Sequence, residues 1–232
     1  NEIKDIKVLV VEDIALNQLL IKTLLDDFVF EHDIAVNGKI AIEKLKENSY
    51  DIILMDLQMP EMNGFEATDY IRNKMNSTIP IIALTADVTT VDLTKCKAVG
   101  MNDYIAKPVD EKLLYNKIIE LVKKSAMSGV HGQVENIDTK KLKCTNLAYL
   151  IQRTKSNPAL MMEMISLYLE QTPPLIITMK QSLLNKDWKS LQAAVHKMIP
   201  SFLIVGISAD FETMAKKVQE YAGNQLQSEG IP

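Results

Sequence analysis

Cysteine is nearly absent from the sequence, with only Cys96 and Cys144 among 232 residues. Two cysteines are too few for a disulfide framework, and we interpret both as reduced cytosolic thiols. No apolar run approaches the roughly 20 residues that a membrane-spanning helix needs, and no signal-peptide pattern opens the chain. We therefore expect a cytoplasmic protein, or the cytoplasmic portion of a membrane-bound one, with no membrane contact by this chain. The first residue is Asn1 rather than Met, and we expect either a fragment of a longer protein or a processed chain.

The chain also lacks a strong charge of either sign, and its formal net charge is −4. Residues 1–132 carry 15 Lys and Arg against 21 Asp and Glu, a net charge of −6. Residues 133–232 carry 11 against 9, a net charge of +2. Because neither half is strongly basic, we expect no nucleic-acid partner. Hydrophobic residues make up 47% of the sequence, which is enough to build the core of one large domain or of two small ones.

Two short apolar runs end in acidic residues: Ile52–Met55 precedes Asp56, and Val8–Val11 precedes Glu12 and Asp13. Such runs predict buried strands of a parallel sheet. The carboxyl ends of neighbouring parallel strands meet at one edge, where ligands bind. Three carboxylates there would repel one another unless one is protonated or a cation binds. A cluster of oxygen ligands predicts Mg²⁺, and solvated loop acids are the competing interpretation.

Strand and helix patterns alternate through the first half of the chain. Five such repeats predict an α/β fold with a doubly wound, five-stranded parallel sheet. The fourth predicted strand ends at Thr85, and the fifth, Met101–Ala106, ends at Lys107. Together with the carboxylates, these residues supply a metal site, a nucleophile, a hydrogen-bond donor and a cation. That set favours phosphoryl transfer to an aspartate, which requires positioning and charge neutralisation more than a general base.

Four stretches resemble the receiver domain of two-component signalling, which has a flavodoxin-like fold: Val8–Asp13, Asp56–Gly64, Leu84–Ala86 and Tyr104–Pro108. We assign residues 1–124 to such a domain. The resemblance implies that Asp56 accepts the phosphoryl group, and it implies the following Mg²⁺ ligands: Glu12, Asp13, Asp56 and Gln58. It further implies that Thr85 and Lys107 bind the phosphate and that Tyr104 is a switch residue. The stretch Glu12–Gln18 resembles receivers attached to hybrid histidine kinases. We also predict a cis peptide bond between Lys107 and Pro108, because Lys107 must turn back over Asp56.

Polar and glycine residues over 125–137 predict a linker, and helical patterns follow over 138–232. The predicted helices span Leu147–Thr154, Pro158–Asn185, Trp188–Val205 and Ala209–Ala222. Short connections between such helices predict an all-α bundle. Proline should kink the second helix at Pro173 and Pro174, and Pro200 should bend the third.

The third of these helices carries a candidate acceptor, His196. An apolar stripe runs along the helix through Trp188, Leu191, Val195, Met198, Phe202 and Val205. His196 lies roughly 130° from the centre of that stripe, so we expect its side chain to be exposed. The stretch Leu191–Ser201 resembles the histidine phosphotransfer (HPt) domain, which implies that His196 accepts phosphate from a receiver aspartate.

Three departures from the HPt pattern have consequences. That family commonly has Lys three residues after the His and a small residue at the fourth position, where this chain has Ile199 and Pro200, so Lys197 or Lys189 would supply the cation. Its bundle commonly has one more helix, which this chain lacks after Ala222. We therefore expect exposed apolar surface on this domain, covered by a second copy in a dimer, by a swapped segment or by a missing tail.

Together the two resemblances predict a phosphorelay module, the C-terminal part of a hybrid sensor histidine kinase, with no kinase catalytic domain in this chain. Phosphate would reach Asp56 from an upstream histidine-kinase domain with Mg²⁺, move to His196, and pass to a downstream response-regulator receiver. A Mg-dependent aspartyl phosphatase is an alternative, although such enzymes usually need an acid where this chain has Gln58. A flavodoxin-like electron carrier is disfavoured by Glu12 and Asp13, which would repel a flavin phosphate. Weak charge in the second half disfavours a response regulator with DNA output, whereas one with a helical protein-interaction output stays open.

Overall fold

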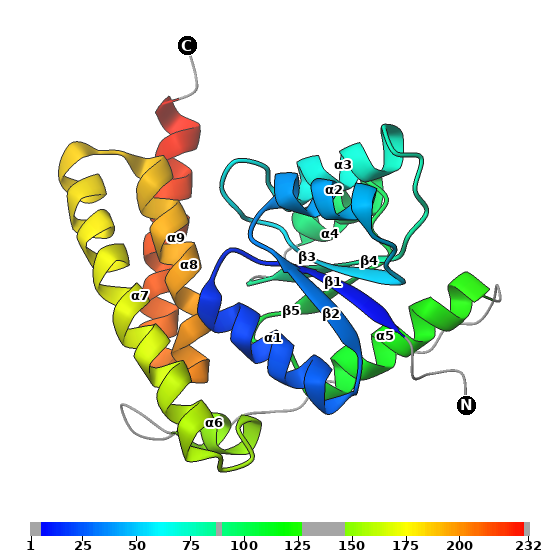
Figure 1. Cartoon of the computed structure of the whole chain (residues 1–232). Coiled ribbons are helices and arrows are strands. Elements are labelled where there is room, and N and C mark those ends of the chain that lie inside the picture. Colours follow the sequence, from blue (N-terminus) through cyan, green and yellow to red (C-terminus); the bar gives the residue numbers. More distant parts are fainter. Residues whose placement is uncertain (1–5, 87–89, 127–146, 230–232) are drawn as a thin grey trace. The chain divides into compact units, whose positions relative to one another are not determined.

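The computed structural model describes residues 6–86, 90–126 and 147–229, and the chain divides into two units, 1–136 and 137–232 (Figure 1). The predicted linker, 125–137, lies outside the described residues except for Ser125 and Ala126, which belong to the last helix of the first unit. Cys144 also lies outside the described residues.

The first unit is a parallel sheet with helices on both faces (Figure 1). Its strands are β1 (Lys7–Val11), β2 (Glu31–Ala35), β3 (Ile52–Asp56), β4 (Ile81–Thr85) and β5 (Asp103–Ala106). Its helices are α1 (Ala15–Asp27), α2 (Gly38–Glu47), α3 (Gly64–Asn73), α4 (Thr90–Ala98) and α5 (Glu111–Ala126). The strand order is β2-β1-β3-β4-β5, and every neighbouring pair is parallel. The predicted doubly wound sheet is therefore confirmed.

Alternating side chains of the strands fill two apolar layers. Val8 and Val10 of β1 face the layer with α1 and α5, whereas Leu9 and Val11 face the layer with α2 and α3 (Figure 1). All five residues of β3 are buried. Because both faces of the sheet are covered, polar side chains of the central strands gather at the carboxyl ends.

Strand β5 begins two residues later than predicted. The backbone N–H of Met101 donates to the Cys96 carbonyl of α4, at 2.9 Å. The Asn102 side-chain oxygen accepts a hydrogen bond from the Ile81 N–H of β4, at 2.8 Å. Met101 and Asn102 therefore close the turn after α4 instead of extending the strand.

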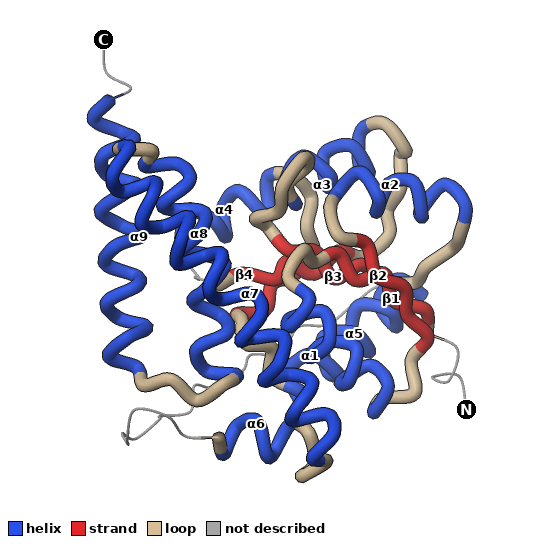
Figure 2. The backbone as a smooth tube through the Cα atoms, turned by 60° about the vertical axis from the view of Figure 1, so that its left-hand side comes forward, coloured by secondary structure: helices blue, strands red, loops and turns tan. Residues whose placement is uncertain are grey.

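The described residues of the second unit form four helices, α6 (Ala148–Arg153), α7 (Pro158–Asn185), α8 (Trp188–Ile204) and α9 (Ala209–Glu229). Helix α8 packs against both α7 and α9 (Figure 2). Helix α9 is longer than predicted, and no further helix follows it among the residues that the structure describes. Helices α7 and α8 both continue through their prolines, so Pro200 does not end α8 early. The bends at the prolines stay predictions.

Gly64, the first residue of α3, allows the helix to begin directly beside the end of β3. A Cβ atom at this position would lie 2.2 Å from the Asp56 carbonyl oxygen. We expect Gly64→Ala to lower the free energy of unfolding of the first unit by about 1–3 kcal/mol, because backbone must move to relieve the overlap. Urea denaturation followed by circular dichroism measures this change.

Gly223→Ala on α9 is the matched control, because its Cβ would meet only the end of the flexible Gln192 side chain. This variant should stabilise α9 or leave it unchanged, as followed by the fluorescence of Trp188, the single tryptophan of the chain. An unaltered unfolding midpoint for Gly64→Ala would show that the contact between α3 and β3 is not tight.

Candidate functional site

Three carboxylates meet at the carboxyl edge of the sheet. Asp56 is the last residue of β3, and Glu12 and Asp13 follow β1. One ligand atom from each of these residues lies within 4.8 Å of the others. The two strands are direct neighbours in the sheet, which explains the convergence. The clustering predicted from the two apolar runs is therefore present.

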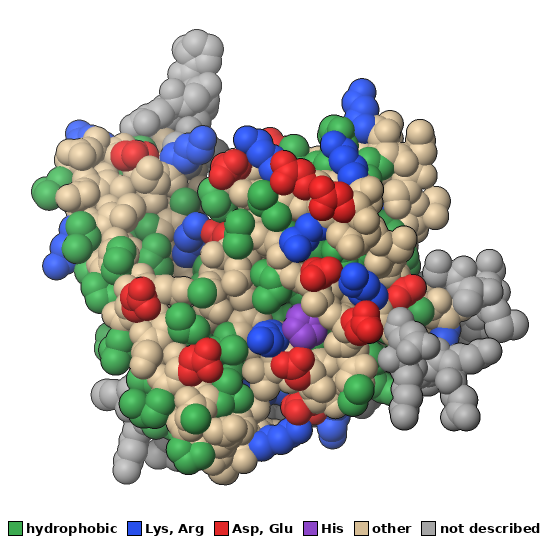
Figure 3. Space-filling view, viewed as in Figure 1, with side chains coloured by type: hydrophobic (Ala, Val, Ile, Leu, Met, Phe, Trp, Pro, Cys, Tyr) green, Lys and Arg blue, Asp and Glu red, His purple; other side chains and the backbone are tan. Residues whose placement is uncertain are grey.

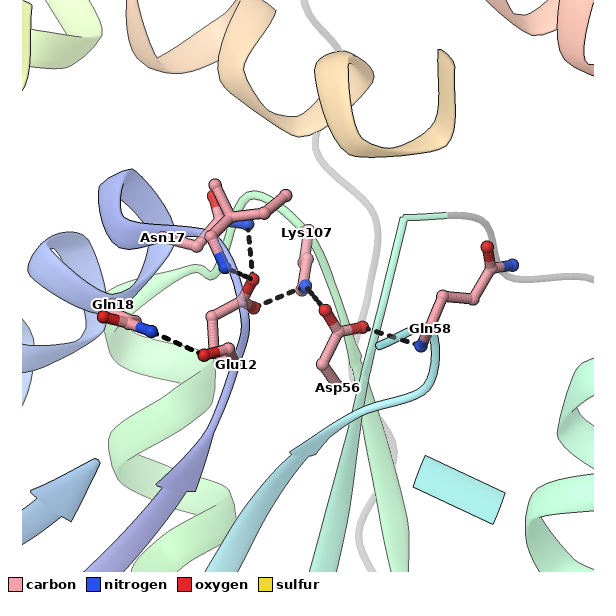
Figure 4. Close-up of polar contacts among 7 residues, drawn as sticks. Glu12, Asn17, Gln18, Asp56, Gln58 and Lys107 are labelled. Atoms are coloured by element: carbon pink, nitrogen blue, oxygen red, sulfur yellow. Dashed lines mark hydrogen bonds and ion pairs between the residues drawn. The ribbon is translucent and has the colours of Figure 1, made fainter. Parts of the chain in front are cut away.

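Lys107, directly after β5, joins two of these carboxylates. Its Nζ lies 2.7 Å from Asp56 Oδ2 and 2.5 Å from Glu12 Oε2, between the two side chains (Figure 4). All three side chains are almost completely buried. Burial lowers the pKa of Lys107, but the negative charges of Asp56 and Glu12 outweigh this effect and raise that pKa above its ordinary value. Lys107 therefore stays an ammonium. Its peptide bond to Pro108 is cis, as predicted.

Glu12 is held in place by the start of α1. Its Oε1 accepts hydrogen bonds from Asn17 Nδ2 at 3.0 Å and from the Ile14 N–H at 3.2 Å. Gln18 Nε2 donates to the Glu12 backbone carbonyl at 2.6 Å (Figure 4). No role was predicted for Asn17 or Gln18 from the sequence. Amide side chains in the first turn of a helix that follows an acidic pair are the signal that would have identified them.

The electrostatics of the cluster favour a bound cation. Burial raises the pKa of Glu12 to about 7, an effect that the positive charge of Lys107 opposes and the negative charge of Asp56 reinforces. One ammonium faces three carboxylates, so negative charge remains. Oxygen ligands of an octahedral Mg²⁺ lie about 2.1 Å from the metal and thus at most about 4.2 Å apart. The observed spacing needs only a small closure, so Glu12, Asp13 and Asp56 fit Mg²⁺ as ligands.

The other predicted residues surround this cluster. The Gln58 N–H donates to Asp56 Oδ1 at 3.2 Å, but its side chain points away from the carboxylates and does not join the cluster (Figure 4). Thr85 is buried at the end of β4. Its backbone carbonyl accepts a hydrogen bond from the backbone N–H of Lys107, at 2.6 Å. Tyr104 lies within β5, and Lys117 Nζ lies 5.5 Å from the centre of its ring.

His196 is buried rather than exposed, so that prediction was wrong. It is only 8% exposed, and its Nδ1 lies 3.2 Å from Gln219 Nε2 of α9. The core residues of α8 are Trp188, Leu191, Val195, Ile199 and Phe202. With Ile199 in the core, the centre of the stripe turns toward His196, to roughly 100° from it. At that angle His196 lies on the flank of α8, where it contacts Gln219 of α9.

Comparisons with known proteins identify the first unit and reach into the second. A family model described as the response regulator receiver domain matches residues 8–119. The histidine-protein kinase BarA of Escherichia coli K12 is 28% identical over 194 residues, which cover 82% of this chain and 21% of that protein. Hybrid signal transduction histidine kinase B of Dictyostelium discoideum is 42% identical over 130 residues, 51% of this chain and 6% of that protein. The chain thus spans a small part of these relatives, and the BarA alignment extends beyond the first unit.

A solved structure gives a similar result. It is the co-crystal structure of the Saccharomyces cerevisiae histidine phosphotransfer protein Ypd1 with the receiver domain of its downstream response regulator Ssk1. The match has 34% identity and a TM-score of 0.51, and it covers 55% of this chain and 96% of that chain. No helix in the described part of the chain is long and apolar enough to span a membrane.

We expect Lys107→Gln to lower the free energy of unfolding by about 3–5 kcal/mol in the absence of Mg²⁺, because Asp56 and Glu12 would stay buried without their shared cation. Added Mg²⁺ should restore much of this loss by neutralising the same carboxylates. Urea denaturation with and without Mg²⁺ measures both effects.

Lys39→Gln serves as the control, because the ion pair of Lys39 with Glu61, 3.3 Å long, is exposed. It should change stability by less than about 1 kcal/mol. Equal stabilities of Lys107→Gln and the wild-type protein in the absence of Mg²⁺ would contradict the role assigned to Lys107.

Proposed function

Residues 8–119 belong to the response regulator receiver family, and from that premise we propose that Asp56 accepts a phosphoryl group from the phosphohistidine of an upstream kinase. The observation that carries this proposal is the buried contact of Asp56 with Lys107, beside two further carboxylates at the sheet edge. Mg²⁺, when bound by those carboxylates, would neutralise the charge of the phosphoryl oxygens.

The proposed step forms one bond and breaks another. An Asp56 carboxylate oxygen bonds to phosphorus while the P–N bond to the donor imidazole breaks, and the electron pair stays on the imidazole nitrogen. The product is an acyl phosphate. Lys107 Nζ, 2.7 Å from Asp56 Oδ2, is placed to bind an oxygen of the transferred group, and Thr85 would bind another. Positioning and charge account for such a transfer. The position two residues after Asp56 is Gln58, which offers no acid for phosphatase turnover.

We further propose that residues 138–232 act as an HPt domain in which His196 accepts phosphate from a receiver aspartate. The support is the resemblance of Leu191–Ser201 and the contact with Gln219. With the amide turned so that its oxygen accepts from Nδ1–H, the Nε2 atom of His196 keeps the lone pair that attacks phosphorus. Ile199 packs in the core, so Lys197 or Lys189 would have to supply the cation.

On these roles, we propose that the chain acts in a phosphorelay as the receiver and phosphotransfer part of a hybrid sensor histidine kinase. Residues 1–124 would receive phosphate from the kinase domain, and His196 would deliver it to the receiver of a separate response regulator. The BarA alignment supports this arrangement because it runs from one unit into the other within a histidine kinase.

Incubation with acetyl phosphate and Mg²⁺ should add one base-labile phosphoryl group to Asp56. Intact-mass analysis should show this addition for the wild-type protein and for Asp51→Asn, which changes an exposed carboxylate directly before β3. Asp56→Asn should remain unmodified. Equal phosphorylation of Asp56→Asn and wild type would overturn the central assignment.

Transfer to His196 is tested by mixing phosphorylated wild-type chain with the Asp56→Asn variant. We expect an acid-labile, base-stable phosphoramidate on the acceptor, and none when the acceptor also carries His196→Gln. Gln219→Ala should slow the transfer about fivefold, the effect of losing one hydrogen bond of about 1 kcal/mol, and should shift its pH profile. His32→Gln is the control. Absence of phosphohistidine on every acceptor would exclude the HPt role.

A further inference from the structure

Helix α7 exposes an apolar row on the side that does not face the core. Four residues of this row follow one another at intervals of seven: Met162, Leu169, Ile176 and Leu183. Their exposed fractions lie between 39% and 63%. The row extends about 32 Å at the 1.5 Å rise of a helix. Ile177 and the 83% exposed Leu184 lie beside its C-terminal half. Figure 3 shows hydrophobic side chains on the part of the surface where α7 lies in Figure 1.

The composition of α7 indicates that this row is covered in the working protein. Only Glu163, Glu170 and Lys180 are charged among its 28 residues, and only Met164 and Ser182 are buried. A helix that is apolar around most of its circumference is normally enclosed by other elements. The described part of the chain contains α8 on one side of α7 and no further helix for the exposed row. A strict seven-residue apolar repeat is the pattern by which helices pair in a left-handed coiled coil.

We propose that the exposed row of α7 binds the same row of a second copy of this chain, with the two α7 helices antiparallel. This interface is self-complementary about a two-fold axis. Met162 of one copy would pack on Leu183 of the second copy, and Leu169 on Ile176 of the second copy. The axis then passes beside Thr172 and Pro173, at the middle of α7.

The charges of α7 select a second copy in the antiparallel direction. Glu163 and Glu170 lie in the first half of the helix and Lys180 lies in the second half. In the antiparallel register, Lys180 comes opposite residue 165 of the second copy, between its two glutamates. A parallel pair in register would instead place glutamate on glutamate and lysine on lysine. Opposite charges across a helix pair favour it and like charges oppose it, so the helix is complementary to itself in one direction only.

Sedimentation equilibrium of the full chain tests the proposal. We expect a dimer for the wild-type protein and a monomer for the double variant Leu169→Glu, Ile176→Glu. Circular dichroism and Trp188 fluorescence should show that the double variant keeps its helices. Leu203→Glu is the control, because Leu203 is an apolar residue of α8 with a similar exposure of 43%, and this variant should stay dimeric. A wild-type monomer at all concentrations, or an unchanged dimer in the double variant, overturns the proposal.

Disulfide cross-linking tests the direction of the pair in a Cys144→Ser background, where the remaining Cys96 is buried. Pro173→Cys lies beside the axis, so the two copies should form an intermolecular disulfide readily. Leu184→Cys lies far from it, and its two copies would be about 35 Å apart along an antiparallel pair. Because a disulfide needs Cα atoms within about 7 Å, this variant should not cross-link. Cross-linking through Leu184→Cys would establish a parallel pair instead, because a parallel pair in register brings both of these positions beside their own copies.

Discussion

The crowding of carboxylates at a buried sheet edge is the constraint on which the candidate site depends. Glu12 and Asp56 are buried beneath the helices that cover the sheet, so water cannot hydrate their negative charges. Lys107 compensates part of this negative charge by contacting both carboxylates at once. The negative charge that remains makes the edge suitable for Mg²⁺, and the proposed phosphoryl transfer uses both cations to stabilise oxygens that carry charge.

The positions of the site residues follow from the strands that end at them. Asp56 could be placed from the sequence because a fully buried strand is an uninterrupted apolar run, and its last residue marks the edge of the sheet. Lys107 was placed in the same way after β5. The hydrogen bonds of Asn17 and Gln18 with Glu12 were not predicted, because they depend on how α1 begins rather than on any periodic pattern. The start of β5 was also missed, because it depends on the hydrogen bond between the Asn102 side chain and Ile81, which lies 21 residues away in the sequence.

The second unit shows where periodicity is less informative. The stripe on α8 could be drawn through Met198 or through Ile199, and the two choices differ by one residue. That single residue rotates the buried face enough to move His196 from the surface to the flank against α9. Helix α7 poses the opposite problem, since it has more apolar surface than α8 covers. Because α7 is apolar around most of its circumference, the sequence does not show which side of it is buried. The apolar side that α8 leaves uncovered is the row proposed to pair two chains.

The central claim is that the carboxylate cluster holds the cation that makes Asp56 reactive. The most direct measurement is the initial rate of phosphorylation at Asp56 as a function of Mg²⁺ concentration, for the wild-type chain and for Asp13→Asn. The account predicts a rate that saturates with Mg²⁺ in the wild-type protein, that requires much more Mg²⁺ in Asp13→Asn, and that vanishes with a chelator. A wild-type rate that is unchanged by the chelator, or the same Mg²⁺ dependence in Asp13→Asn as in the wild-type protein, would contradict it.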